Sequence, residues 1–268
     1  GMPFPNNLSP APGEPELSFD QFCANLQAAG VTTLRVKLCG FNHPLSTTVD
    51  SFEPRLAEFN DWGGRLGEMV DAMRAHGIGI QAIPFDREEW MAGWGDHAWN
   101  VDNGGFLADP REAFTHPRAL EAAKARIDAI AEQCGDVIDA WEVCAEMSFL
   151  VSPDWWGVPS WVEMRPIVRE TLVPWVEEIA RYIGSQHTAP IGNGQIFAPG
   201  GFDDNPNHPS NLRNEIFAVP SLDFALINWY GTDLAAKVAW LRECQARFDK
   251  PICVEQYAPW DAVPGSGS

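Results

Sequence analysis

Short apolar runs alternate along the chain with longer stretches whose apolar residues recur at helical spacing. The apolar runs predict six strands, at residues 31–40, 78–85, 137–146, 189–197, 224–231 and 251–259. The longer stretches predict helices at residues 18–30, 59–77, 116–135, 168–186 and 233–248. Residues 2–10 could form one further short strand at the start. Strict alternation of strand and helix is typical of a parallel sheet with helical crossovers.

Two α/β architectures share this alternation, the open doubly wound sheet and the closed (β/α)8 TIM barrel. The chain contains neither a GxGxxG nor a GxxxxGK[ST] phosphate-binding turn, which a nucleotide-binding doubly wound sheet needs. Its long loops, 86–116 and 147–161, follow strands, as active-site loops do in a TIM barrel. Only eight residues follow Trp260, whereas another strand and its crossover need about 30. The prediction is a (β/α)8 barrel that is incomplete or irregular at the eighth strand.

The interior shows no linker and no shift in composition, so a single domain over residues 1–268 is expected. Gly1 before Met2 resembles the remnant of a tag, and residues 264–268 are expected to be a flexible tail. No signal peptide is evident, which predicts a cytoplasmic protein, with secretion open if residues have been removed from the start. No apolar run approaches the length that spans a membrane.

Charge and composition narrow the class of partner. The net charge of −19 argues against nucleic acid and anionic membranes. A neutral carbohydrate is compatible with that charge, and the twelve Trp residues suit it because indole faces stack on sugar rings. The six Cys and six His residues show no metal-ligand spacing, and the acidic loop 202–208 lacks the spacing of a calcium-binding EF-hand. The prediction is therefore no metal and no organic cofactor, and the oligomeric state is left open.

Two of the predicted strands carry a glutamate near their carboxyl ends, Glu146 and Glu255. Side chains two residues apart in a strand share a face, so Glu146 would lie with Cys144 and Glu255 with Cys253. Carboxylates that converge at the mouth of a barrel suit glycosidic bond cleavage, with one as acid and base and the other as nucleophile. The alternative is that each glutamate forms a salt bridge at the rim.

The segments "DAWEVCAEM" and "KPICVEQYAPW" resemble the fourth and seventh strands of clan A glycoside hydrolases, particularly the cellulase-type family 5 enzymes. This resemblance implies that Glu146 is the acid/base and Glu255 the nucleophile. The segment "AAGVTTLRVKL" is similar to the second strand of those enzymes, which implies that Arg35 supports the nucleophile. The segment "INWYG" resembles the sixth strand, which implies that Tyr230 hydrogen-bonds the nucleophile, while Asn228 replaces the usual His.

The sequence also departs from the pattern of the clan. Ala145 stands where those enzymes carry an Asn that binds the 2-hydroxyl of the sugar, and Asn193 or Gln195 on the next strand could replace it. The third strand ends with Asp86 nearby instead of the usual His. Glu142 is expected to be a structural partner for an interior cation, for which Arg35 is the candidate.

Aromatic residues complete the predicted cleft. Trp260, just after the nucleophile, is the predicted platform for a sugar ring. Further subsites are expected to be lined by loop tryptophans, namely Trp90, Trp94, Trp155 and Trp156. The prediction is a retaining β-glycosidase that hydrolyses a β-linked oligo- or polysaccharide. The alternatives are a barrel that binds carbohydrate without cutting it and a metal-dependent barrel enzyme.

Overall fold

The computed structural model describes residues 18–38, 66–196, 204–230 and 234–258. The chain divides into two compact units, an amino-terminal unit (Met2–Trp141) and a carboxy-terminal unit (Glu142–Ser268). The predicted strand at 2–10 and Trp260 lie outside the described residues. That residues 1–268 form a single domain stays a prediction.

The amino-terminal unit alternates strands with helices, as predicted. Its strands are β1 (Thr33–Lys37), β2 (Gly79–Ile83) and β3, which runs from Ile138 to the unit boundary (Ile138–Glu142). Its α-helices are α1 (Phe19–Ala28), α2 (Leu66–His76), α3 (Arg87–Trp90) and α4 (Pro117–Cys134). Short 3-10 turns occupy Trp94–Asp96, Val101–Asn103, Pro110–Phe114 and Gly135–Val137. The three strands are parallel, in the order β1-β2-β3.

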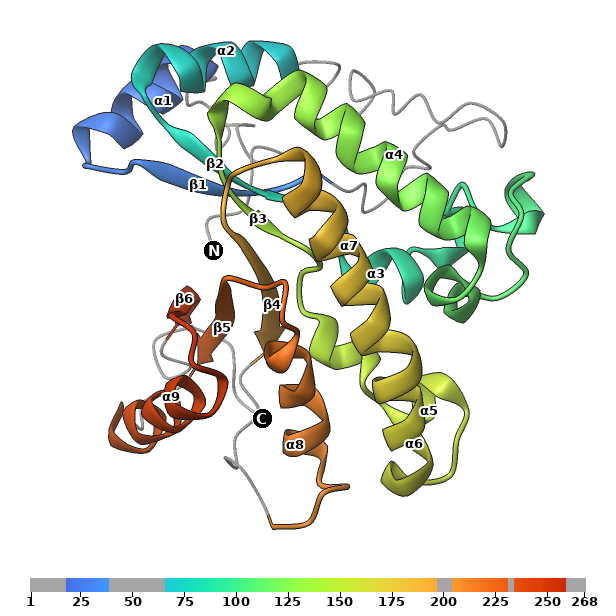
Figure 1. Ribbon diagram of the computed structural model, residues 1–268. Helices are drawn as coiled ribbons and strands as arrows, with labels where there is room; N and C mark the ends of the chain where they lie inside the picture. Colours follow the sequence, from blue (N-terminus) through green and yellow to red (C-terminus); the bar gives the residue numbers. More distant parts are fainter. Residues whose placement is uncertain (1–17, 39–65, 197–203, 231–233, 259–268) are drawn as a thin grey trace, which may run out of the picture. The chain divides into compact units, whose positions relative to one another are not determined.

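Local chemistry explains where helix α1 begins and how it meets α2. Ser18 Oγ accepts from the backbone N–H of Gln21 at 3.2 Å, and the Gln21 side chain accepts from the Ser18 N–H at 3.1 Å. This capping box satisfies two N–H groups that the first turn leaves without partners. Helices α1 and α2 lie side by side (Figure 1), and Gln27 Nε2 donates to the carbonyl of His76 at 2.9 Å.

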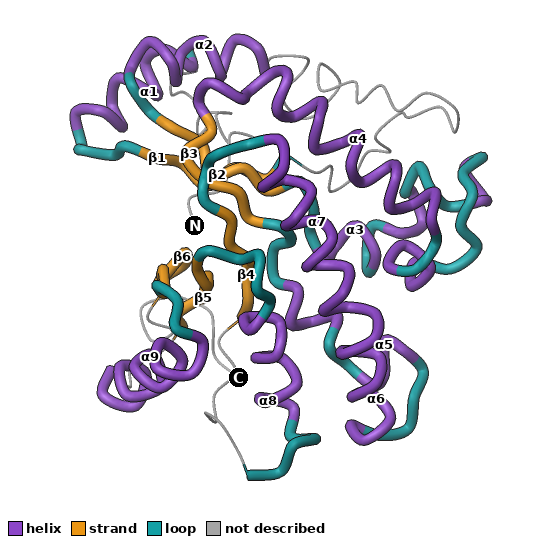
Figure 2. Tube along the Cα trace, in the orientation of Figure 1, coloured by secondary structure: helices purple, strands orange, loops and turns teal. Residues whose placement is uncertain are grey.

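The carboxy-terminal unit contains strands β4 (Ile191–Ile196), β5 (Phe224–Tyr230) and β6 (Ile252–Ala258), which are parallel and hydrogen-bonded in that order. Its α-helices are α5 (Pro153–Trp156), α6 (Trp161–Ile167), α7 (Val173–Gln186), α8 (Pro209–Asn214) and α9 (Leu234–Phe248). Three short elements lie between these helices and strands. They are two 3-10 turns, η8 (Met147–Leu150) and η10 (Glu215–Ala218), and one π-turn, η9 (Val168–Leu172). Figure 2 distinguishes the helices and strands from the loops between them.

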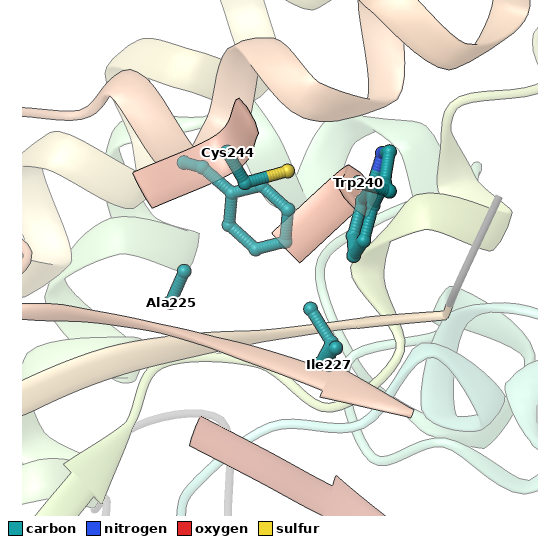
Figure 3. Close-up of a cluster of buried hydrophobic side chains, with 5 residues drawn as sticks. Ala225, Ile227, Trp240 and Cys244 are labelled. Atoms are coloured by element: carbon teal, nitrogen blue, oxygen red, sulfur yellow. The ribbon is translucent and has the colours of Figure 1, made fainter. Parts of the chain in front are cut away.

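Helix α9 packs on strand β5 through apolar side chains. Trp240 and Cys244 on the helix lie against Ala225 and Ile227 on the strand (Figure 3), and Phe217 completes the cluster. All five side chains are buried. The two strand residues are two positions apart and so share one face of the sheet. Ordinary hydrophobic burial therefore holds this helix to its strand.

Helix α7 is joined to α6 through the π-turn η9, where the sequence predicted a regular helix that begins at residue 168. Pro174 has no N–H to donate to the carbonyl four residues earlier. The N–H of Val173 instead bonds the carbonyl of Val168, five residues back. The helical run also begins earlier than predicted, at Trp161. A proline in the first turn of α7 therefore widens the helix without ending it.

Strand β3 is shorter than predicted. The apolar run 137–146 predicted a strand that ends on Glu146, but β3 ends at Glu142. The four residues that follow are buried or half-buried and leave the regular strand geometry. The first three of them, Val143, Cys144 and Ala145, are apolar and fully buried, so the sequence pattern could not show where the strand stops.

In the described part of the chain, no helix is long and apolar enough to cross a membrane.

Candidate active site

Glu146 occupies a strained turn after strand β3. Its backbone is left-handed, with φ 53° and ψ 33°. Among the described residues other than glycine, only Asp249 also has a positive φ. Its carbonyl accepts from the N–H of Phe149 at 3.1 Å, which starts turn η8. A side chain in this conformation costs about 1–2 kcal/mol. Strained backbone conformations are concentrated at functional sites, so this conformation favours a functional role for Glu146.

Strand β4 fixes the backbone that leads to Glu146. The N–H of Val143 donates to the carbonyl of Gly192 at 2.9 Å. The N–H of Cys144 donates to Asn193 Oδ1 at 3.1 Å, and its carbonyl accepts from the N–H of Gly194 at 3.3 Å. The Asn193 side chain is fully buried. The structure therefore gives Asn193 a bracing role two residues before Glu146, and its predicted contact with substrate stays a prediction.

Glu142 ends strand β3 as a fully buried carboxylate. A Cβ atom built on Gly194 would clash with Glu142 Oε1, so the glycine leaves room for this carboxylate beside β4. The strand that finishes on a glutamate therefore finishes on Glu142, four residues before the residue that the sequence indicated. The predicted pairing of Glu142 with Arg35 stays a prediction.

Strand β6 carries Glu255 at a break in its pairing. Ile227 of β5 pairs with Val254, but the next residue, Asn228, pairs with Gln256. Glu255 is therefore the extra residue of a β-bulge. The strand continues to Ala258, three residues past Glu255, close to the predicted end at residue 259. Bulges redirect the chain beside active sites, and here one interrupts the alternation that predicted a shared face for Cys253 and Glu255.

The other predicted site residues are placed as follows. The structure describes the side chains of Arg35 and Trp94 in the amino-terminal unit, and of Trp155 and Trp156 in the carboxy-terminal unit. All four are half-buried. The side chains that lie outside the described residues are those of Gln195, Asn228, Tyr230, Glu255 and Trp260.

The tryptophans of helix α5 are attached to the turn that follows Glu146. Trp156 Nε1 donates to the carbonyl of Leu150, the last residue of turn η8, at 2.8 Å. Trp155 meets Trp156 edge to face, with ring centroids 5.0 Å apart. Because both rings are half-buried, they can present apolar surface to a ligand and hold the loop at the same time.

In the amino-terminal unit, Trp94 stacks on His97 with centroids 5.4 Å apart. Trp90 is 1% exposed and packs on Phe85 and Phe114. The prediction that Trp90 lines a subsite is therefore wrong, because a side chain without exposed surface cannot bind a sugar.

Sequence reasoning missed a buried ion pair inside the long loop that follows β2. Glu89 Oε2 accepts from Arg126 Nη1 at 2.8 Å and from His97 Nε2 at 3.3 Å, and Glu89 Oε1 accepts from the N–H of Asp86 at 3.1 Å. All four residues are buried. Burial alone would raise the pKa of Glu89, but the charge of Arg126 and the hydrogen bond from His97 outweigh it and hold that pKa below its ordinary value.

A second missed pair lies at the carboxyl ends of two neighbouring strands. Lys37 is the last residue of β1, and its ammonium contacts Asp86 Oδ2, just after β2. Asp86 Oδ1 accepts from the N–H of Glu88 at 2.9 Å and caps helix α3. Asp86 is fully buried, and burial raises its pKa more than Lys37 and that N–H lower it. The capping box after Asp86 was visible in the sequence, but its partner Lys37 was not.

Within the described residues, no group of three or more His, Cys, Asp and Glu side chains is placed to hold a metal ion.

No protein-family model matches the sequence, and no curated protein matches it. Solved structures do match. An endo-β-1,4-mannanase from Thermotoga petrophila aligns over 92% of this chain and 58% of its own, with a TM-score of 0.59 and 15% identity. A glycoside hydrolase family 5 mannosidase from Rhizomucor miehei aligns over 88% and 61%, with a TM-score of 0.53 and 14% identity. A family 1 β-glucosidase from Thermotoga maritima aligns over 86% and 64%, with a TM-score of 0.51 and 13% identity.

The chain has the fold of clan A glycoside hydrolases. The predicted (β/α)8 barrel, incomplete or irregular, is thereby confirmed as the fold class. The chain spans about three fifths of the length of these three solved structures, and at such low identity the likeness concerns the fold alone. In barrels of this class, active-site residues follow the carboxyl ends of strands. Lys37, Asp86 and Glu146 all hold such positions.

The conformation of Glu146 makes a prediction about stability. We expect the free energy of unfolding of Glu146→Gly to be about 1 kcal/mol higher than that of Glu146→Ala. Glycine adopts a positive φ without strain, whereas alanine does not. Urea denaturation followed by tryptophan fluorescence measures the difference. The same pair of substitutions at Glu243 on helix α9 is the control, where alanine should be the more stable. If alanine is also more stable at position 146, the backbone there is not left-handed in solution.

Proposed function

We propose that this protein is a retaining β-glycosidase, with Glu146 as acid/base and Glu255 as nucleophile. The observation that carries the proposal is the strained, left-handed Glu146 after β3 in a chain with a glycoside hydrolase fold. The bulge at Glu255 in β6 supports it. If residues 2–10 form a strand, β3 and β6 become the fourth and seventh strands, which carry the two carboxylates in clan A.

The proposed reaction is a double displacement. The Glu146 carboxyl group donates its proton to the glycosidic oxygen while a Glu255 carboxylate oxygen attacks the anomeric carbon, and the leaving sugar departs as an alcohol. Glu146, now ionised, then takes a proton from water as the water oxygen attacks the same carbon. The ester bond to Glu255 breaks, and the sugar leaves with the anomeric configuration that it had at the start.

The substrate class follows from the same reasoning. A β-linked gluco- or manno-oligosaccharide is proposed, because the solved structures with this fold include a mannanase, a mannosidase and a β-glucosidase. The chain's negative charge favours a neutral sugar over an acidic one. Arg35 and Tyr230 are proposed to support the nucleophile as their counterparts do in clan A, and Gln195 and Asn228 to bind the reacting sugar. Trp260 is proposed as the stacking platform for a sugar ring, with further subsites lined by Trp155, Trp156 and Trp94.

The anomeric configuration of the product tests the mechanism. We expect 4-nitrophenyl β-glucoside or β-mannoside to release the β-anomer first, as followed by proton NMR in the first minutes of hydrolysis. Initial release of the α-anomer would replace retention by inversion with the same two carboxylates. A complete lack of hydrolysis across β-linked substrates would refute the proposed enzyme.

A second candidate function is binding of carbohydrate without hydrolysis. Ala145 favours it, because this fully buried residue stands where clan A carries the Asn that binds the 2-hydroxyl of the sugar. A contact of that kind contributes several kcal/mol to the transition state. Oligosaccharide binding without turnover would identify this function.

A further inference from the structure

Lys37 and Asp86 combine features that a helix cap alone does not require. Capping α3 uses one oxygen of Asp86, the one that accepts from Glu88. The other oxygen contacts the ammonium of Lys37. Asp86 is wholly buried, whereas the Lys37 side chain is 31% exposed. The carboxylate therefore lies on the buried side of the ammonium and holds it near the solvent-exposed surface.

Burial of the ionised Asp86 carboxylate costs stability, and Lys37 offsets only part of that cost. Burial of Asp86 outweighs the help of Lys37 and of the backbone, which is why the pKa of this carboxyl is raised. An ordinary N-cap can be supplied by Asn at no such cost. Groups that lower the stability of a fold are retained where function needs them. The register of β1 on β2 places Lys37 opposite Ile83, three residues before Asp86, so both lie at the carboxyl edge of this sheet.

The charge of the pair indicates the ligand. Asp86 neutralises Lys37, so this pair carries no net positive charge. Such a site favours a neutral, hydroxyl-rich ligand over a free anion, and the chain's charge of −19 repels anions further.

We propose that Lys37, held by Asp86, is a carbohydrate-binding residue whose ammonium donates to a sugar hydroxyl at the carboxyl edge of β1 and β2. This inference rests on the proposed function for its ligand class. Asp86 is a positioning residue: it fixes the ammonium and does not itself contact the sugar.

Calorimetric titration with the β-1,4-linked trisaccharides of glucose and of mannose tests the proposal, in a Glu255→Gln background so that the ligand is not consumed. We expect Lys37→Met to weaken binding by about tenfold or more, the scale of one lost hydrogen bond to a charged group. Asp86→Asn keeps the cap, and we expect it to weaken binding without lowering the midpoint of thermal unfolding. Lys124→Met on helix α4 is the matched control and should bind like the parent.

Removing Lys37 alone leaves a buried carboxylate without its cation, so the double variant Lys37→Met/Asp86→Asn provides a folded test without either charge. Trisaccharide affinity that is unchanged in the double variant, or a parent that binds neither trisaccharide, overturns the proposal. A protein that binds through Lys37 but hydrolyses nothing refutes the proposed function and leaves this inference standing. If the protein hydrolyses the substrates but its trisaccharide affinity does not depend on Lys37, this inference is refuted and the proposed function stands.

Discussion

Glu255→Gln is expected to reduce hydrolysis of 4-nitrophenyl β-glucoside and β-mannoside by at least about 10⁴-fold, the scale seen when other enzymes lose their nucleophile. An amide oxygen attacks the anomeric carbon far less readily than a carboxylate, so the glycosyl-enzyme does not form. Initial rates of nitrophenol release measure the loss. Glu243→Gln, the same change on helix α9, should leave the rate unchanged.

Glu146→Gln serves as the companion variant because its effect depends on the leaving group. Nitrophenol departs with little protonation, whereas a sugar alcohol needs a proton from Glu146. The loss should therefore be much larger for a disaccharide, about 10²–10⁴-fold, than for formation of the glycosyl-enzyme from the nitrophenyl substrate. Equal activity of Glu255→Gln and the parent would remove Glu255 from the reaction.

Arg126→Met is expected to lower the free energy of unfolding of the amino-terminal unit by about 3–5 kcal/mol, because it leaves the carboxylate of Glu89 buried without its cation. The guanidinium also lies over the rings of Phe85 and Trp99, at 4.8 and 5.6 Å, so packing is lost as well. Urea denaturation at pH 7 measures the change. Arg247→Met removes an exposed pair with Glu243 and should cost no more than about 1 kcal/mol.

The same variant should change how stability depends on pH. The folded pKa of Glu89 lies below its unfolded value, so the stabilisation from this group is complete above the unfolded pKa and is lost as the pH falls through the folded one. In Arg126→Met burial acts without the opposing charge, so Glu89 binds a proton more readily when folded than when unfolded. The difference in unfolding free energy between the parent and Arg126→Met should therefore shrink as the solution is acidified towards the pKa of Glu89 in the unfolded chain. A deficit that is constant with pH would show that Arg126 acts through packing alone.

Much of the fold could be predicted because strands and helices bury different periodic patterns. Each of the six described strands lies within a predicted apolar run, and Gly77 follows helix α2 as a predicted end signal. Hydrophobic pattern reports burial, however, and burial continues past the end of a strand. Val143, Cys144 and Ala145 are fully buried but lie outside β3, so the pattern extended the strand to Glu146.

The site was predictable to a lesser extent. The motifs indicated Glu146 and Glu255, but period-two alternation could not reveal a left-handed residue at one and a bulge at the other. The pairs Lys37–Asp86 and Glu89–Arg126 were missed because their members are 49 and 37 residues apart, and no spacing rule connects them. Such contacts depend on which strands and helices become neighbours, which local pattern does not contain.

The left-handed turn at Glu146 has a consequence for anyone who evolves this protein in the laboratory. A library selected for heat resistance or soluble yield alone should enrich glycine at position 146, since glycine relieves the turn. Every such winner would lack the proposed acid/base. Selection for stability thus favours glycine at position 146, whereas selection for activity favours glutamate. Only a screen that selects for product formation in every round will retain the glutamate.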